Sequence, residues 1–314
     1  MLKITRGKIQ RAQRVVIYGP EGIGKSSLAV QFPDPLVIDT EGGTAHMDIR
    51  RIDKPQSWEE LLSIVKEVAV TRDLCRTLVI DTADWAEQLI IRHVCERYKQ
   101  DSIESFGYGK GYIYVSEEFA RFLSCCDRVI DAGMHVVITA HAQMRKFEQP
   151  DEMGAYDRWE MKLSKKTAPL LKEWCDFLFF CNYQTFAATS ENDTKMTQGG
   201  KRVMYTAHHP TYDAKRRVPL PDVMDLDYEG IAPIFEAPQR TACRVLPQEK
   251  LRFLMVEDGV TEEELRSVVA ARGHYPPDTP TSEYPDSFVN GWLLRYWDQI
   301  LDLLRTDQNA CIAG

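Results

Sequence analysis

Short apolar runs and longer segments with a helical period alternate along the first 182 residues of the chain. The apolar runs have the length of strands that are buried on both faces. They cover residues 14–18, 36–39, 77–81, 135–140 and 176–181. The helical segments cover about 58–70, 84–99, 116–132 and 168–174. This alternation predicts an α/β fold with a mostly parallel sheet.

The pattern changes after residue 140. The polar stretch 141–166 has mixed charge and no clear period, which predicts a long loop. Residues 183–189 and 202–206 predict a hairpin. A linker-like composition near residue 237 predicts a boundary between a core at 1–237 and a small helical module at 238–314. Within that module, helices are expected at about 261–272, with a capping box at its start, and at 288–304.

The octapeptide GPEGIGKS fits the phosphate-loop pattern G-x-x-x-x-G-K-[ST] and directly follows the first predicted strand. Glycines let such a loop wrap a phosphate with its N–H groups pointing inward. Lys25 is expected to reach the terminal phosphates and Ser26 to ligate Mg²⁺. The alternative is a plain glycine turn between strand and helix. The predicted nucleotide-binding residues are Gly19, Pro20, Glu21, Gly22, Ile23, Gly24, Lys25, Ser26 and Ser27.

Two carboxylates follow predicted strands. Asp81 ends the apolar run TLVID, a Walker B pattern whose aspartate holds Mg²⁺. Glu41 comes just past the strand at 36–39, where a carboxylate can orient or deprotonate the water that attacks the γ-phosphate. The other interpretation of Glu41 is a turn residue beside two glycines.

Three further residues are candidates for catalysis. His141 follows the strand at 135–140 and could contact the γ-phosphate, with Gln143 as the next choice; a structural histidine is the alternative. Lys215 and Arg217 lie in the basic segment AKRR. They either stabilise transition-state charge on a neighbouring subunit's nucleotide or form an ordinary surface cluster.

Together, VIDTEGG, ITAHAQ and AKRR-x-PLP resemble the RecA-like P-loop ATPase core over about residues 10–237. The resemblance is strongest to a phage-encoded ATP-binding family that includes single-strand annealing proteins. It implies ATP and Mg²⁺ as cofactors and self-association into a ring or filament. It also implies that Lys215 and Arg217 act across the subunit interface, and that single-stranded DNA binds near the loop after His141.

Composition limits these functions. The formal net charge of −8 argues against a generally basic surface, so DNA contacts must come from local patches. One candidate is the basic segment 1–20, for which a solvated tail is the alternative; the loop after His141 adds Lys165 and Lys166. No apolar run approaches the roughly 20 residues of a membrane span, so no membrane association is expected. Eight cysteines without a paired framework predict a reducing cytoplasm, that of the bacterial host if the protein is phage-encoded.

Two functions remain open at this point. The first is an Mg²⁺-dependent ATPase that acts on single-stranded DNA in recombination or annealing, with Tyr108, Tyr112 and Tyr156 available to stack on bases. The second is an ATP-dependent switch or assembly factor that acts on a protein, such as a phage or host replication or recombination protein bound by the C-terminal module. A small-molecule kinase is disfavoured, because a water-activating Glu41 would waste ATP.

Overall fold

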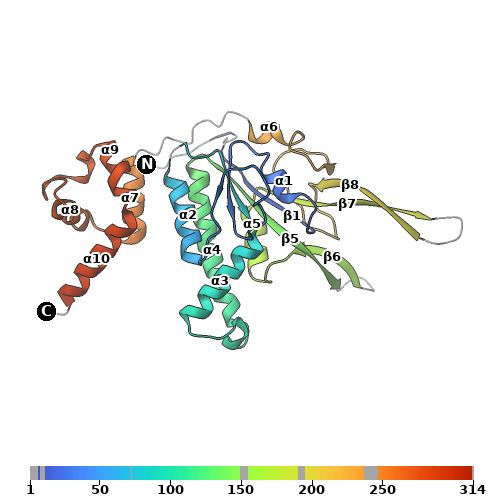
Figure 1. Ribbon diagram of the computed structural model, residues 1–314, viewed down its shortest axis with the longest axis horizontal. Helices are drawn as coiled ribbons and strands as arrows, with labels where there is room; N and C mark the ends of the chain where they lie inside the picture. Colours follow the sequence, from blue (N-terminus) through green and yellow to red (C-terminus); the bar gives the residue numbers. More distant parts are fainter. Residues whose placement is uncertain are drawn as a thin grey trace. The chain divides into compact units, whose positions relative to one another are not determined.

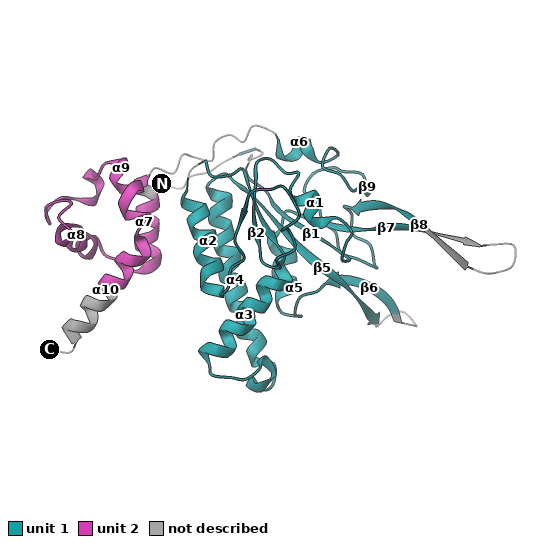
Figure 2. Ribbon diagram, viewed as in Figure 1, with its two compact units in different colours: residues 1–240 teal, residues 241–314 magenta. Residues whose placement is uncertain are grey.

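The computed structural model describes residues 6–7, 11–71, 73–148, 155–189, 195–236 and 247–312. The chain divides into two compact units, residues 1–240 and 241–314 (Figure 2). The boundary predicted at 237/238 falls in segment 237–246, which lies outside the described residues. Each unit has its own hydrophobic core.

One large sheet forms the centre of the first unit (Figure 1). Its strand order is β3-β2-β4-β5-β1-β7-β8-β9, and β6 pairs with β5 outside this path. Neighbours from β3 to β7 are parallel, whereas β7–β8, β8–β9 and β5–β6 are antiparallel. The strands are β1 (Arg14–Gly19), β2 (Pro35–Asp39), β3 (Arg51–Ile52), β4 (Thr77–Asp81), β5 (His135–Glu148), β6 (Ala155–Met161), β7 (Phe177–Thr189), β8 (Lys195–Tyr205) and β9 (Val223–Asp225).

Helices cover both faces of this sheet, which explains why its strands are continuously apolar. In β1, Val16 and Tyr18 point into one core cluster, and Val15 and Ile17 point into the other. Helices α2 (Trp58–Val70), α3 (Ala83–Arg97), α4 (Lys110–Asp131) and α5 (Thr167–Trp174) supply the first cluster. Helices α1 (Lys25–Ala29) and α6 (Ala232–Phe235) supply the second. A 3₁₀ turn, Ile103–Phe106, lies between α3 and α4.

The prediction of a long loop at 141–166 is wrong. Strand β5 continues to Glu148, and its outer half pairs with β6 as an antiparallel ribbon. Phe147 lies opposite Tyr156 in this ribbon, and their ring centroids are 5.6 Å apart. The side chains of residues 142–147 and 156–160 are exposed or half-buried, so most of them are polar and conceal the strand period. The second hairpin is likewise longer than predicted, because β7 reaches Thr189 and β8 begins at Lys195.

The second unit is helical in its described part. It contains α7 (Pro247–Asp258), α8 (Glu262–Ala271), a 3₁₀ turn (Thr281–Glu283), α9 (Asp286–Phe288), a π-helical turn (Val289–Leu293) and α10 (Trp297–Ile312). The capping box expected at the start of α8 is present, with Thr261 and Glu264 bonded reciprocally. The sequence did not reveal α7, and the helix predicted at 288–304 is interrupted by the π turn before α10 begins. None of the helices in the described ranges is both long enough and apolar enough to cross a membrane.

Candidate nucleotide-binding site

The phosphate loop connects the carboxyl end of β1 to α1, and its geometry requires glycine at two positions. Gly19 packs so closely on β7 that a Cβ atom there would lie 2.2 Å from the carbonyl oxygen of Cys181. Gly24 has φ of +108°, a backbone conformation that favours glycine. A side chain at either position would therefore displace the loop from the strands that support it.

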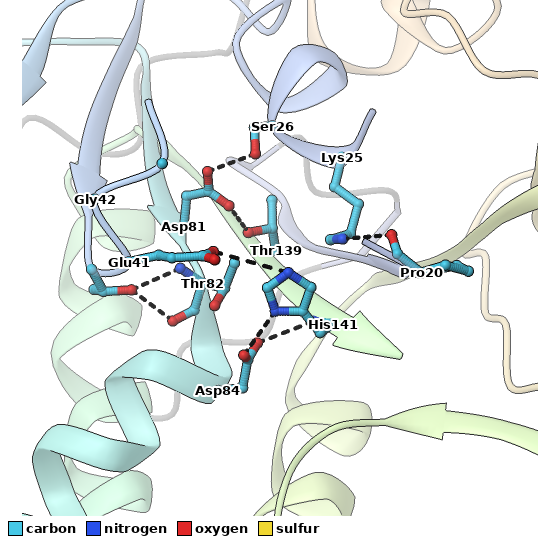
Figure 3. A network of polar contacts seen from close by, with 12 residues as sticks. Pro20, Lys25, Ser26, Glu41, Gly42, Asp81, Thr82, Asp84, Thr139 and His141 are labelled. Carbon is cyan, nitrogen blue, oxygen red and sulfur yellow. Dashed lines mark hydrogen bonds and ion pairs between the residues drawn. The ribbon is translucent and has the colours of Figure 1, made fainter. Parts of the chain in front are cut away.

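Lys25 is buried inside this loop, with 5% of its surface exposed. Its Nζ donates hydrogen bonds to the carbonyl oxygens of Gly19 and Pro20, at 3.2 and 2.9 Å. Burial lowers the pKa of Lys25, while the nearby carboxylate of Asp81 opposes that shift. The structure thus holds an ammonium group at the centre of the loop, where it can meet a phosphate (Figure 3).

Asp81 ends β4 and contacts two hydroxyl groups. Ser26 Oγ donates to its Oδ2 at 2.7 Å, and Thr139 of β5 donates to its Oδ1 (Figure 3). The contact with Thr139 follows from the register, which places Ile80 beside Ile138. A hydroxyl and a carboxylate side by side, next to a phosphate-binding loop, suit Mg²⁺, which binds oxygen ligands and keeps several waters. Ser26 and Asp81 are therefore the residues that could hold this ion.

Glu41 lies in a tight loop after β2 that Asp39 organises. The Asp39 carboxylate accepts hydrogen bonds from the backbone N–H groups of Gly42 and Thr44, at 2.6 and 2.8 Å, and from Thr44 Oγ1 at 2.6 Å. Burial alone would raise the pKa of Asp39, but these hydrogen bonds lower it. Lys54 Nζ donates to the carbonyl oxygen of Glu41 at 2.8 Å. The loop is thereby fixed, while the Glu41 side chain stays 37% exposed.

His141 lies directly beside the phosphate loop, because β5 pairs with β1 so that His141 is opposite Gly19. Asp84 holds it by two contacts: its carboxylate accepts from the His141 backbone N–H at 3.0 Å and lies 2.8 Å from Nδ1. Burial would raise the pKa of Asp84, but the hydrogen bonds from His141 lower it. The ring is thus oriented with Nε2 facing Glu41, 3.9 Å from Oε2 (Figure 3).

A family comparison agrees with this geometry. A sequence model described as AAA domain matches residues 11–218, more than half of the chain and the whole phosphate-loop region. The chain belongs to the AAA domain family. It is therefore a P-loop protein of the nucleotide-binding ATPase class. A comparison with curated proteins finds no match.

The sequence missed several residues of this AAA domain that support the site, among them Asp39, Lys54 and Thr139. Asp39 ends an apolar strand as Asp81 does, and only the folded loop shows that its carboxylate accepts from Gly42 and Thr44. Thr139 sits inside a strand, so only the pairing of β4 with β5 reveals its contact with Asp81. Asp84, at the start of α3, is the residue that orients His141.

Lys215 and Arg217 lie at the opposite end of the AAA domain's sheet from the phosphate loop of the same chain. The backbone of Lys215 pairs with Leu178, near the start of β7. Its Nζ donates to three carbonyl oxygens at the end of α5, those of Lys172, Glu173 and Cys175, at 3.2, 3.1 and 2.6 Å. Arg217 Nε lies 3.8 Å from Asp176. Both residues thus contact their own chain at the amino end of the sheet, and their action on a neighbouring subunit's nucleotide stays a prediction.

Proposed function

We propose that this AAA-domain protein hydrolyses ATP with Mg²⁺, and that Glu41 orients and deprotonates the attacking water. One observation carries this proposal: Glu41, Asp81, His141 and the phosphate loop meet at the carboxyl ends of neighbouring parallel strands (Figure 3). Ligands of open α/β sheets bind at this edge. When bound, Mg²⁺ neutralises charge that develops on the phosphates. Within the chain, Lys25 binds terminal phosphate oxygens and Ser26 and Asp81 hold the ion.

His141 supports this role of Glu41. Its Nδ1–H is held by Asp84, so Nε2 faces the site and can accept a hydrogen bond from the water beside Glu41. The carbonyl oxygen of His141 accepts from Lys162 N at 2.8 Å. His141 is also followed without a break by the β5–β6 ribbon. A change at the phosphate therefore has a covalent and hydrogen-bonded route into that ribbon.

We further propose that the protein acts on single-stranded DNA in recombination or annealing, as a RecA-like assembly of several subunits. Exposed cations follow the ribbon: Lys162, Lys165 and Lys166. Tyr108, flanked by two glycines with positive φ, is fully exposed and is followed by the exposed Lys110. Aromatic groups near cations are the usual components of single-strand binding surfaces. A phage origin fits the sequence resemblance on which this proposal also rests.

The acidic balance favours the second candidate, a switch that acts on a protein partner. ATP hydrolysis measured with and without an oligothymidine distinguishes the two. The DNA proposal expects stimulation by the oligonucleotide and binding that weakens steeply with salt. Lys165→Ala/Lys166→Ala should weaken that binding and reduce its salt dependence. The control Arg252→Ala/Arg295→Ala removes the same charge from exposed positions of the second unit and should leave binding unchanged. Equal binding by both variants would contradict the DNA proposal.

A further inference from the structure

Strand β8 brings a cation to the side of the phosphate loop that faces away from Glu41. Strand β7 continues past the carboxyl end of β1, and β8 returns alongside it (Figure 1). In this pairing Arg202 lies opposite Tyr183. Arg202 Nη1 lies 3.4 Å from the carbonyl oxygen of Ile23. It would lie 3.0 Å from a Cβ atom placed on Gly24. The guanidinium therefore touches the phosphate loop itself.

The sheet fixes the backbone from which this exposed side chain extends. The carbonyl oxygen of Arg202 accepts from Leu226 N at 3.3 Å, and Val203 pairs with Asp225 of β9. The β7–β8 register shifts immediately before Arg202, since Tyr183 is opposite Arg202 but Thr185 is opposite Gly199. Such irregularities occur beside functional sites, where they redirect a side chain. The backbone of Arg202 is thus paired with strands on both sides, and its side chain extends from there to the loop.

The charge of Arg202 is not neutralised by the part of the chain that the structure describes. No carboxylate of those residues forms an ion pair with it, whereas neighbouring cations have such partners. Lys201 Nζ lies 2.5 Å from Asp225, and Arg216 Nη2 lies 2.8 Å from Asp222. The guanidinium has five N–H donors, and its contact with Ile23 is long. Donors and positive charge therefore remain available beside a loop that binds a polyanion.

We propose that Arg202 is a nucleotide-binding residue, which contacts oxygens of the α- and β-phosphates of the nucleotide held by its own chain. This inference rests on the phosphate-loop assignment and not on the DNA proposal. Two placements favour these phosphates. The loop backbone cradles the α- and β-phosphates, and Arg202 touches that backbone at Ile23 and Gly24. Glu41 and His141, which we place at the γ-phosphate, follow β2 and the parallel part of β5. These strands lie on the other side of β1 from β7 and β8.

Equilibrium binding of Mg-ATP and Mg-ADP to the full-length chain tests this assignment. Arg202→Ala should weaken both nucleotides by a similar factor of roughly 10 to 100, the scale of losing a charged hydrogen-bonding group. Lys201→Ala is the matched control, because it removes an equal charge from the residue of β8 that directly precedes Arg202. It should change either affinity by less than about 2-fold, as expected of an exposed ion pair.

Two additional measurements separate direct binding from support of the loop. The nucleotide-free Arg202→Ala protein should unfold at the same temperature as the parent, and its affinity for ATP should depend less on salt. Arg202→Lys keeps the charge and should recover part of the affinity. Unchanged affinities, a loss confined to ATP, a loss equal to that of Lys201→Ala, or no recovery with lysine would each overturn the proposal.

Discussion

The two ends of strand β5's parallel segment each carry a buried histidine, and the two histidines are held differently. At the amino end, His135 Nδ1 accepts from the backbone N–H of Gln13 at 2.9 Å, and Nε2 lies 3.2 Å from the carbonyl oxygen of Phe235. At the carboxyl end, Asp84 holds one nitrogen of His141 while the other faces Glu41. Backbone groups occupy both nitrogens of the first ring, whereas the second keeps one nitrogen directed toward the site.

The same contrast holds for the cations at the two ends. Lys215 has three hydrogen-bond donors, and three carbonyl oxygens of its own chain accept from it. Lys25 donates to two carbonyl oxygens, both inside the phosphate loop, and Arg202 has no ion-pair partner in the described ranges. We therefore expect the amino end of the sheet to contribute mainly to stability and the carboxyl end to activity. Substitutions at the two ends should therefore affect different measurements.

The largest effect is expected at the phosphate loop. Lys25→Ala should weaken ATP binding by roughly 100-fold or more, because removing one partner of a buried charge contact costs about 2–5 kcal/mol. Titration calorimetry with Mg-ATP measures this loss. An affinity within a few-fold of the parent would refute the assignment of the loop, and Lys215→Ala should leave the affinity unchanged.

A pH effect on stability is expected at the amino end. Burial lowers the pKa of His135 from 6.5 to about 4. The unfolded chain therefore takes up this proton first as pH falls, and stability is lost between pH 6.5 and 4, by up to roughly 3 kcal/mol. Urea unfolding of the parent and of His135→Leu at pH 7 and 4.5 tests this. The variant should lose less stability on acidification; parallel losses would show that His135 does not contribute.

A smaller effect is expected at Lys215. Its ammonium caps the carbonyl end of α5, so Lys215→Ala should lower the free energy of unfolding by about 1–3 kcal/mol, the scale for hydrogen bonds to a charged group. Arg217→Ala, which removes an exposed charge 3.8 Å from Asp176, should cost less than about 1 kcal/mol. Chemical unfolding measures both changes.

The role of these two residues across a subunit interface needs a separate assay. Chains with Glu41→Gln are mixed with chains carrying Lys215→Ala/Arg217→Ala. Recovery of ATP hydrolysis above either variant alone would show that the cations act on a neighbour's nucleotide, and would break the division between the two ends. Without recovery in assemblies shown to be mixed, Lys215 and Arg217 serve only their own chain.

The sequence could predict site residues that lie at the ends of apolar strands. It could not predict contacts that depend on the pairing of strands far apart in the chain. Asp81 could be placed because it ends an apolar strand, and the phosphate loop and Glu41 because they come directly after one. Arg202 could not, because it reaches the loop only through the pairing of β7 with β1 and β8 with β7. The β5–β6 ribbon was missed because most of its side chains are exposed or half-buried, so its strands need no continuous apolar run.

The basic segment around Lys215 shows a different limit. A sequence reveals the charge of a side chain but not whether its donors are already used. Lys215 to Arg217 has the residue types of a transition-state contact, yet the fold places Lys215 at a helix end where three carbonyl oxygens accept from it. The position of α5 before β7 decides this, and that position depends on the whole sheet.

Single-turnover hydrolysis by Glu41→Gln tests the central claim most directly, that the carboxyl end of the sheet is an ATP hydrolysis site with Glu41 as its base. The amide keeps the size of the side chain but cannot accept a proton from water. At saturating Mg-ATP, bound nucleotide should remain at the parent level while hydrolysis slows by about 10²-fold or more. Hydrolysis at the parent rate with nucleotide bound would contradict the account and assign the attacking water to another residue.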